Sequence, residues 1–215
     1  MAIVAVAGRK GGIGKSTITG NLAGEFVAMG WNVAALDTDP QHSLAAWADQ
    51  GKGVLARCVQ KVRRVDVDEL RAQARAGQKS ADIVLIDTPP GIPEITYAAM
   101  LLADLVLLPC GPSPLDLYPL KDAVGMGLKA RSERGAKKPR IRFVPSKILK
   151  NTNLGRELAG SLEALGRKVL PGISQRIVLA EVVTRGLTVS EFAPASAARE
   201  EFSELARAVE SILKR

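Results

Sequence analysis

The sequence predicts an α/β protein with a mostly parallel central sheet and helices on both faces of that sheet. Short apolar runs alternate with segments of helix length along the chain, which favours parallel strands joined by crossover helices. These runs are nearly continuous in Val, Ile and Leu, as in strands that are buried on both faces. A chain of 215 residues with 47% hydrophobic residues can bury a core, and we expect residues 1–215 to form a single domain.

Six apolar runs are the predicted strands, and three of them end in residues suited to bind a ligand. The first ends at a glycine-rich stretch, the second at Asp37 and the fourth at Asp87. The carboxyl ends of the strands form the rim where an open parallel sheet binds its ligand. The predicted strands are residues 3–7, 33–36, 54–59, 83–86, 105–108 and 141–144.

The glycine-rich stretch, GRKGGIGKST at residues 8–17, lies between the first strand and a helix-like run at residues 18–29. A strand, a glycine-rich turn and a helix N-terminus together hold phosphate, because backbone N–H groups point inward and the helix dipole adds positive potential. In the usual pattern, G-x-x-x-x-G-K-[ST], the lysine contacts the outer phosphates and the hydroxyl binds Mg²⁺. Gly14, Lys15 and Ser16 fit, but Arg9 stands where the first glycine belongs.

The stretch fits a variant pattern, x-K-G-G-x-G-K-[ST], in which Lys10 is a second lysine. It resembles the ParA/MinD family of ATPases, most of all the short ParA-type partition ATPases. The resemblance implies a P-loop NTPase domain, ATP and Mg²⁺ as cofactors, and a homodimer in which Lys10 reaches the ATP of the opposite subunit. It implies catalytic roles for Lys10, Lys15 and Asp39. The predicted nucleotide-binding residues are Lys10, Gly11, Gly12, Ile13, Gly14, Lys15, Ser16 and Thr17.

Two other interpretations of this stretch are open. The glycines can form a bare turn in which Lys10 is a solvated surface charge. A Rossmann dinucleotide site is also conceivable, but reading its pattern from Gly12 and Gly14 puts Thr17 where the third glycine belongs. The position of the loop between a strand and a helix favours the phosphate site over both.

The second strand ends in DTDPQ at residues 37–41. Mg²⁺ prefers oxygen ligands and keeps several waters, and an attacking water must be oriented toward the γ-phosphate. The pentapeptide resembles the family's switch I region. By that resemblance Asp37 helps hold the metal through water, and Asp39 orients or activates the attacking water. Taken alone, an Asp-Pro turn that ends a strand would explain the same residues.

The fourth strand ends in IVLID followed by TPPG, at residues 83–91. Four apolar residues and an aspartate form a Walker B arrangement, in which a buried strand presents one carboxylate to the Mg²⁺ shell. The prolines stop the strand, so a defined turn follows. This turn resembles the family's switch II. The predicted metal site therefore consists of Ser16, Asp37 and Asp87.

Three segments after the fifth strand complete the resemblance. Residues 109–116 contain three prolines and are expected to form a rigid loop. Lys147 and residues 171–173 are candidates to pass over the adenine, as loops do in this family. Residues 196–215 are expected to form a helix whose stripe of Phe202, Leu205, Val209 and Ile212 packs on the domain.

Positive charge is concentrated in the later part of the chain. The net charge is +8, and residues 129–185 hold fourteen Lys or Arg but only four Asp or Glu. Clustered positive charge favours a polyanion, above all nucleic acid, although a solvated surface is the plain alternative. Contacts to the phosphate backbone would make binding nonspecific and salt-dependent. The candidate DNA contacts are Arg156, Arg167, Lys168, Arg176 and Arg185.

Composition also bears on location. No apolar run approaches the ~20 residues of a membrane span, and the N-terminus lacks the features of a signal peptide. Cys58 and Cys110 lie in apolar surroundings and are expected to be buried thiols in a reducing compartment. We therefore expect a cytoplasmic protein without a membrane partner, and the family resemblance implies association with the nucleoid when ATP is bound.

These predictions point to a ParA-type ATPase that dimerises on ATP, binds DNA nonspecifically and hydrolyses ATP when a ParB-like partner stimulates it. Its cargo would be a plasmid, a chromosome or a protein assembly. A MinD-like ATPase that cycles on membranes is one alternative, but the C-terminal helix mixes acidic with basic residues on its polar face. A small-molecule P-loop enzyme of the dethiobiotin synthetase kind is another, and it would not need the basic segment.

Overall fold

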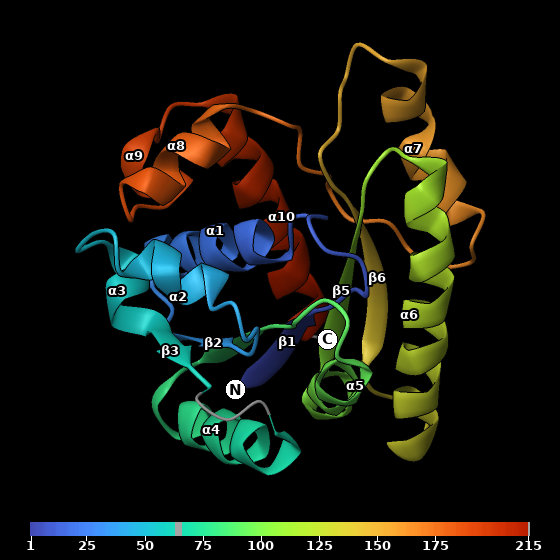
Figure 1. Ribbon diagram of the computed structural model, residues 1–215, viewed down its shortest axis with the longest axis horizontal. Coiled ribbons are helices and arrows are strands. Elements are labelled where there is room, and N and C mark those ends of the chain that lie inside the picture. The colour runs from blue at the N-terminus through green and yellow to red at the C-terminus, as the bar shows by residue number, and fades with distance from the viewer. Residues whose placement is uncertain (63–65, 215) are drawn as a thin grey trace.

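The computed structural model describes residues 1–62 and 66–214, and its centre is a six-stranded parallel sheet (Figure 1). The strand order is β3-β2-β4-β1-β5-β6. All the pairings between these strands are parallel, as the sequence predicted. The strands are β1 (Ala2–Val6), β2 (Val33–Asp37), β3 (Val59–Lys61), β4 (Ile83–Asp87), β5 (Leu105–Cys110) and β6 (Arg140–Pro145).

Helices cover both faces of the sheet, and each face has its own apolar core. The strands supply both cores: Ile3 and Ala5 face one side of β1, whereas Val4 and Val6 face the other. One face is covered by α4 (Val67–Ser80), α5 (Pro93–Leu102), α6 (Pro114–Glu133) and α7 (Asn153–Glu163). The other is covered by α1 (Lys15–Ala28), α2 (Ser43–Ala48), α3 (Val54–Cys58), α8 (Val178–Thr184), α9 (Val189–Phe192) and α10 (Ala197–Leu213).

Hydrogen bonds from two threonines join the carboxyl ends of three neighbouring strands. Asp87 is in register with Asp37 on one side and with Val6 on the other. Thr38 donates its hydroxyl to the Asp87 carbonyl (2.6 Å), and Thr88 donates its hydroxyl to the Val6 carbonyl (3.1 Å). Both threonines are buried. The end of β1 and the carboxylates of β2 and β4 are therefore held at one rim of the sheet.

The prediction of a strand at residues 54–59 is wrong for most of its length. Val54–Cys58 is the short helix α3, and strand β3 occupies only Val59–Lys61. Val54, Leu55 and Cys58 are buried, which is the spacing of one face of a helix rather than of a strand. The helix is also anchored from outside, because Glu191 accepts a hydrogen bond from the Val54 amide (2.8 Å).

The prediction of a rigid loop at residues 109–116 is also wrong at both ends. Strand β5 continues to Cys110, and helix α6 begins at Pro114. Proline suits the first turn of a helix, where its missing N–H costs nothing, and Ser113 caps the helix by accepting from the Leu115 amide. Only residues 111–113 remain as a loop.

The other predictions of local structure are confirmed. The first helix begins at Lys15, three residues before the predicted start, and α10 follows its capping residue Ser196. Phe202, Leu205 and Val209 are buried in the core, and Ile212 packs against it. The last residue of the predicted C-terminal helix, Arg215, lies outside the described residues. Both cysteines are buried and free.

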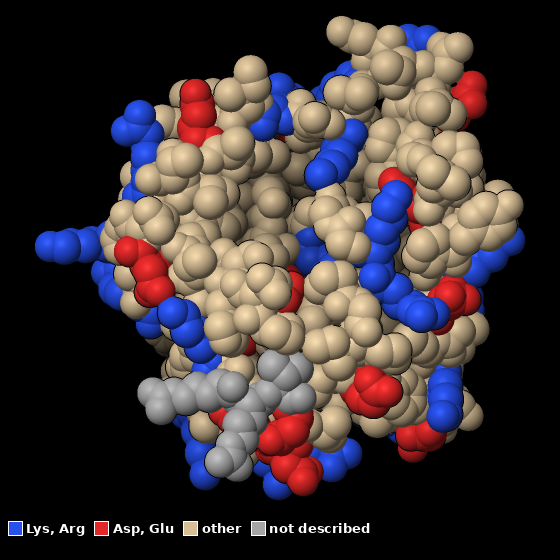
Figure 2. Space-filling view, in the orientation of Figure 1, with Lys and Arg blue, Asp and Glu red and all other residues tan. Residues whose placement is uncertain are grey.

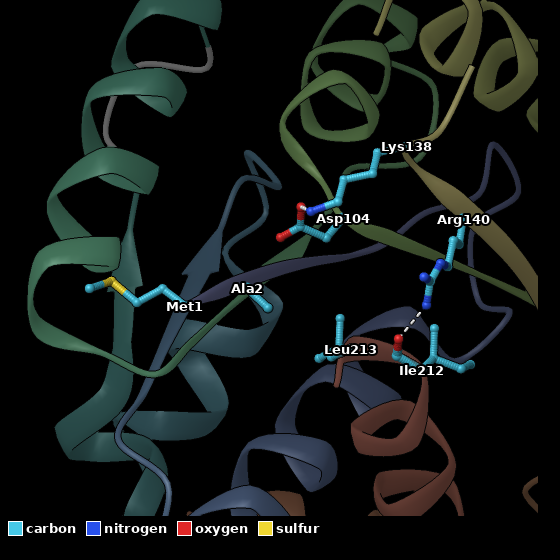
Figure 3. A pocket seen from close by; sticks show the side chains of 7 residues that line it. All are labelled: Met1, Ala2, Asp104, Lys138, Arg140, Ile212 and Leu213. Carbon is cyan, nitrogen blue, oxygen red and sulfur yellow. Dashed lines mark hydrogen bonds and ion pairs between the residues drawn. The ribbon is translucent and has the colours of Figure 1, made fainter. Parts of the chain in front are cut away.

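The end of the sheet opposite the rim is closed by ion pairs and a helix end (Figure 3). Asp104 accepts hydrogen bonds from the Ile3 amide (2.9 Å) and from Lys138 (2.7 Å). Arg140 donates to the Ile212 carbonyl and so caps the last turn of α10. A small hollow of about 190 Å³ lies between these groups, in which Lys138 is paired with Asp104 and Arg140 is bound to the Ile212 carbonyl.

Candidate functional site

The glycine-rich loop takes a backbone conformation that favours glycine. Gly12 and Gly14 have φ values of 73° and 91°, in the left-handed region that side chains with a Cβ rarely occupy. A Cβ at Gly14 would also lie 2.8 Å from Ser146 Oγ, and that hydroxyl donates to the Ile13 carbonyl (2.9 Å). The loop is thus fixed from behind by the end of β6.

Helix α1 opens directly from this loop, with Gly14 as its N-terminal cap. No acidic residue lies in its first turn, so the partial positive charge of the helix N-terminus is available to an anion. Lys15 is 6% exposed, and its ammonium donates to the Lys10 carbonyl (3.1 Å) across the loop. Burial lowers the pKa of Lys15, while Asp87 and Asp39 act in the opposite direction.

Asp87 is the buried carboxylate of the site, with 1% of its surface exposed. Thr19 Oγ1 lies 3.4 Å from its Oδ1, and Oδ2 has no hydrogen-bond partner among the described residues. Burial raises the pKa of Asp87 to about 7; the Ser16 hydroxyl lowers this pKa and the neighbouring Asp37 raises it further. A buried carboxylate with one oxygen that lacks a hydrogen-bond partner is stabilised by a nearby cation.

The groups around Asp87 fit Mg²⁺ rather than a softer metal. Ser16 and Asp87 offer only oxygen donors, and Oδ2 of Asp87 is free to accept a metal-bound water. Among the described residues no three His, Cys, Asp or Glu side chains converge on one point. This suits Mg²⁺, which takes one or two carboxylates and fills its shell with waters and substrate phosphates.

Asp37 ends β2 and Asp39 follows it, and of the two only Asp39 lines the hollow over the loop. Asp37 is fully buried, and its two carboxylate oxygens accept the amides of Asp39 (3.0 Å) and Ala45 (2.9 Å). Burial raises the pKa of Asp37, and the two amide hydrogen bonds partly offset this. Asp37 therefore shapes the turn that presents Asp39, whose own Oδ1 accepts the Gln41 amide (2.9 Å). Asp39 is half-buried and lines the same hollow as Lys15 and Ser16.

The two residues that make the loop unusual both bind to helix α6. Lys10 forms an ion pair with Asp116, a carboxylate that is only 10% exposed. Arg9 forms an exposed ion pair with Asp122 (2.7 Å). These partners are more than a hundred residues away in the chain, and the sequence analysis assigned neither aspartate to the site. The Lys10 side chain itself remains 40% exposed.

Two adjoining hollows lie over the loop. One, of about 400 Å³, is lined by Lys15, Ser16 and Asp39, and the other, of about 340 Å³, extends beside α1 to residues 173–176. Gly14, Thr17 and Lys147 line both hollows, which therefore lie side by side. Figure 2 shows a hollow in the middle of the face drawn there, with Lys and Arg side chains on one side of it. Of the predicted adenine contacts, Lys147 and residues 171–173, only Lys147 and Ile173 line the second hollow.

The five predicted DNA contacts do not gather at one place. Arg156 lies on α7, and Arg167 and Lys168 follow that helix. Arg176 instead lies in the wall of the second hollow and pairs with Glu201. Arg185 lies over the ring of Phe192.

The structure adds three arginines that the sequence did not single out. Burial and then the charges of Arg140, Arg131 and Arg167 lower the pKa of Arg142 on the edge strand β6. A cluster of like charges is thus the distinguishing feature of this edge. Only Arg167 of the cluster was among the predicted DNA contacts. Positively charged residues at every second position of a predicted edge strand are the signal that would have identified Arg140 and Arg142.

Comparison with known proteins agrees with this geometry. The family model for the CobQ/CobB/MinD/ParA nucleotide binding domain matches residues 4–189. The maintenance of carboxysome distribution protein A of Halothiobacillus neapolitanus is 30% identical over 188 residues, which cover 86% of this chain and 85% of that protein. The chromosome-partitioning ATPase Soj of Thermus thermophilus is 29% identical, with 96% of this chain and 94% of that protein covered.

Solved structures show the same fold. The ATP complex of a McdA variant from Cyanothece superposes with a TM-score of 0.77 at 17% identity, covering 100% of this chain and 96% of that one. The septum site-determining protein MinD of Pyrococcus horikoshii, complexed with Mg-ADP, has a TM-score of 0.77 at 22% identity, covering 99% of this chain and 97% of that one.

We expect Asp87→Asn to stabilise the ligand-free protein at alkaline pH and to abolish its stabilisation by Mg·ATP. Because the pKa of Asp87 is raised from 3.8 to about 7, the folded state keeps a proton that the unfolded state loses between these values. Wild-type stability should therefore fall as pH rises through this window. The variant avoids this loss of folding stability, which amounts to up to about 4 kcal/mol at 1.36 kcal/mol per pKa unit.

Urea unfolding at about pH 4 and about pH 8, with and without Mg·ATP, measures both effects. Asp68→Asn is the matched control, because the Asp68 side chain is 94% exposed. If Asp87→Asn is less stable than wild type at alkaline pH, the prediction is wrong and the Asp87 charge is compensated within the fold.

Proposed function

Because the chain belongs to the CobQ/CobB/MinD/ParA family of nucleotide-binding domains, we propose that it is a ParA-type positioning ATPase. It binds Mg·ATP at the glycine-rich loop, dimerises across two nucleotides, and binds DNA nonspecifically as that dimer. Hydrolysis is slow until a partner protein stimulates it. The relatives named for carboxysome distribution and chromosome partitioning support a cargo that is distributed within the cell, either a protein assembly or DNA.

The observation that carries this proposal is the position of Lys10. A lysine that served only its own nucleotide would point into the hollow, where Lys15 already lies. Lys10 instead turns away to Asp116 at the rim and keeps 40% of its side chain exposed. From there it can leave Asp116 and reach an ATP held by a second copy that faces this rim. It would then neutralise charge in the transition state, as an arginine finger does.

Each remaining group has a role of its own within one subunit. The loop amides, the α1 N-terminus and Lys15 hold the β- and γ-phosphates. Ser16 and Asp87 would hold Mg²⁺, which would shield the phosphate charges from the attacking water. Asp37, predicted as a third metal residue, has both carboxylate oxygens on backbone amides. Asp39 lies across the hollow from Lys15 and orients that water, and Asp37 fixes the turn that carries Asp39.

The DNA contacts of the proposed function lie on the edge strand β6 and the residues next to it. Arg142 of β6 lies near the like charges of Arg140, Arg131 and Arg167, and Lys168 follows Arg167, so we place backbone contacts there first. None of the described helices is both long enough and apolar enough to cross a membrane. The exposed acids Glu200 and Glu204 of α10 disfavour a membrane-surface role for that helix.

Co-sedimentation tests the function as a whole. We expect ATP to drive the protein down with double-stranded DNA, steeply less so as salt rises, and to leave it in the supernatant with anionic lipid vesicles. ATP-dependent sedimentation with vesicles alone would favour a MinD-like ATPase. Binding of nucleotide without either partner would favour a small-molecule enzyme, and both results would contradict the proposal.

The double variant Arg167→Ala/Lys168→Ala locates the DNA contacts. Each lost phosphate contact should reduce the salt slope by about one. The matched control is Arg75→Ala/Lys79→Ala, which removes two exposed charges of α4. An unchanged slope in the first variant would move the DNA surface away from β6.

Replacing Lys10 with alanine should leave nucleotide binding intact and lower ATP hydrolysis about a hundredfold or more, since a charge supplied in trans acts on the transition state. Phosphate release over hours, with double-stranded DNA present, gives the rate. Arg9→Ala is the control, because Arg9 is adjacent and its ion pair with Asp122 is exposed. Full activity in the Lys10 variant would remove it from the mechanism.

Asp39→Ala should keep the ATP-dependent dimer and lose hydrolysis, because Asp39 orients water and does not hold the phosphates. Light scattering with ATP reports the dimer, and phosphate release reports turnover. Normal turnover in this variant, or loss of the dimer together with hydrolysis, would exclude Asp39 from this role.

A further inference from the structure

The second hollow has one wall that is not part of any regular element. This wall is the segment Ile173–Arg176, which lies opposite Gly14 and Ile18 of the phosphate side. On the proposed function, the hollow is where the base and ribose extend beyond the phosphates. An irregular segment does not hold its shape by itself, so its hydrogen bonds decide how well the hollow is formed before a nucleotide arrives.

One edge of the wall is held by the backbone after β6. Ile148 and Ser174 form a parallel bridge, in which the Ile148 amide donates to the Ile173 carbonyl (3.1 Å) and the Gln175 amide donates to the Ile148 carbonyl (3.0 Å). In such a bridge the flanking residues make the bonds, so the amide of Ser174 itself points away from Ile148. It needs an acceptor on the other side.

Glu201 of α10 is that acceptor. It is 8% exposed, and its carboxylate accepts the Ser174 amide (2.9 Å) on one oxygen. The other oxygen accepts the Ser174 hydroxyl (2.8 Å) and Arg176 (2.9 Å), and it lies 2.9 Å from the Lys150 ammonium. The buried Glu201 carboxylate therefore accepts the hydrogen bond that a carbonyl of a neighbouring strand would accept in a sheet.

These contacts keep Glu201 charged over the whole working range of pH. Burial by itself would raise the pKa of Glu201, but hydrogen bonds from Arg176, from the Ser174 amide and from Lys150 outweigh it and lower the pKa to about 2. The carboxylate therefore holds the wall with charge-assisted hydrogen bonds, which are stronger than neutral ones. Arg176 lines the hollow and is held on the Glu201 side of it.

We propose that Glu201 is a positioning residue for nucleotide binding: from the C-terminal helix it fixes the Ile173–Arg176 wall that packs against the base and ribose. This rests on the proposed function, since it assigns the nucleotide to the two hollows. Glu201 lies behind the wall and does not line the hollow. It acts on affinity for the base-bearing part of the ligand and leaves the phosphate loop unaffected.

Glu201→Gln tests the proposal, because glutamine keeps the shape and removes the charge. We expect the KM for ATP to rise about tenfold, the cost of weakening hydrogen bonds to a charged group, with kcat changed less than about twofold. Glu204→Gln is the matched control: it removes the same charge one turn further along α10, where the side chain is exposed. Calorimetric titration with ATP gives the affinities directly.

Inorganic triphosphate separates positioning of the wall from general damage. It fills the phosphate loop but has no base or ribose, so its affinity should be equal in wild type, Glu201→Gln and Glu204→Gln. Loss of ATP and triphosphate affinity together in Glu201→Gln, or loss of neither, would overturn the proposal. A wild-type protein that binds neither ligand would instead overturn the proposed function.

Lys150→Ala provides a second variant in case Glu201→Gln does not fold. The Lys150 side chain is 64% exposed, so its removal leaves the core intact while taking one cation from the carboxylate. We expect a two- to threefold loss of ATP affinity, about the value of one exposed charge contact, and no change for triphosphate. Unchanged affinity for ATP would contradict the proposal.

Discussion

The buried carboxylate of Asp87 is the constraint on which the site depends. It lies at the end of a central strand with 1% of its surface exposed, and one of its oxygens has no hydrogen-bond partner among the described residues. Such a charge is costly unless a cation compensates it. The parallel register places it beside Asp37, and Lys15 offsets part of its charge. On the proposed function, a metal that arrives with the nucleotide compensates the rest.

The glycine-rich loop supplies positive potential near this carboxylate, and its two lysines lie in different places. Lys15 is buried in the loop, whereas Lys10 is held at the rim by Asp116. The ion pair keeps Lys10 near the site without placing it on the same nucleotide. A residue held in that position suits a site that is completed by a second copy of the chain. The Arg9–Asp122 pair holds the neighbouring residue to the same helix.

The fold and the central motifs could be predicted because they depend on local patterns. Strands buried on both faces require continuous apolar runs, and phosphate loops require glycines at left-handed positions such as Gly14. The short helix Val54–Cys58 was missed because a short, mostly apolar segment, here interrupted by Arg57, fits a strand and a helix equally well. Asp116 and Glu201 were missed because their roles come from contacts across the fold, which no local pattern records.

On the proposed function, Lys10 serves the nucleotide of the opposite subunit, while Asp39 serves its own. Mixing the two inactive variants Lys10→Ala and Asp39→Ala tests it most directly. In a mixed dimer, one site has its own Asp39 and receives Lys10 from the other subunit. An equimolar mixture should regain about a quarter of wild-type ATP hydrolysis, because half of the dimers are mixed and each has one intact site. A mixture as inactive as its components would show that Lys10 acts within its own subunit.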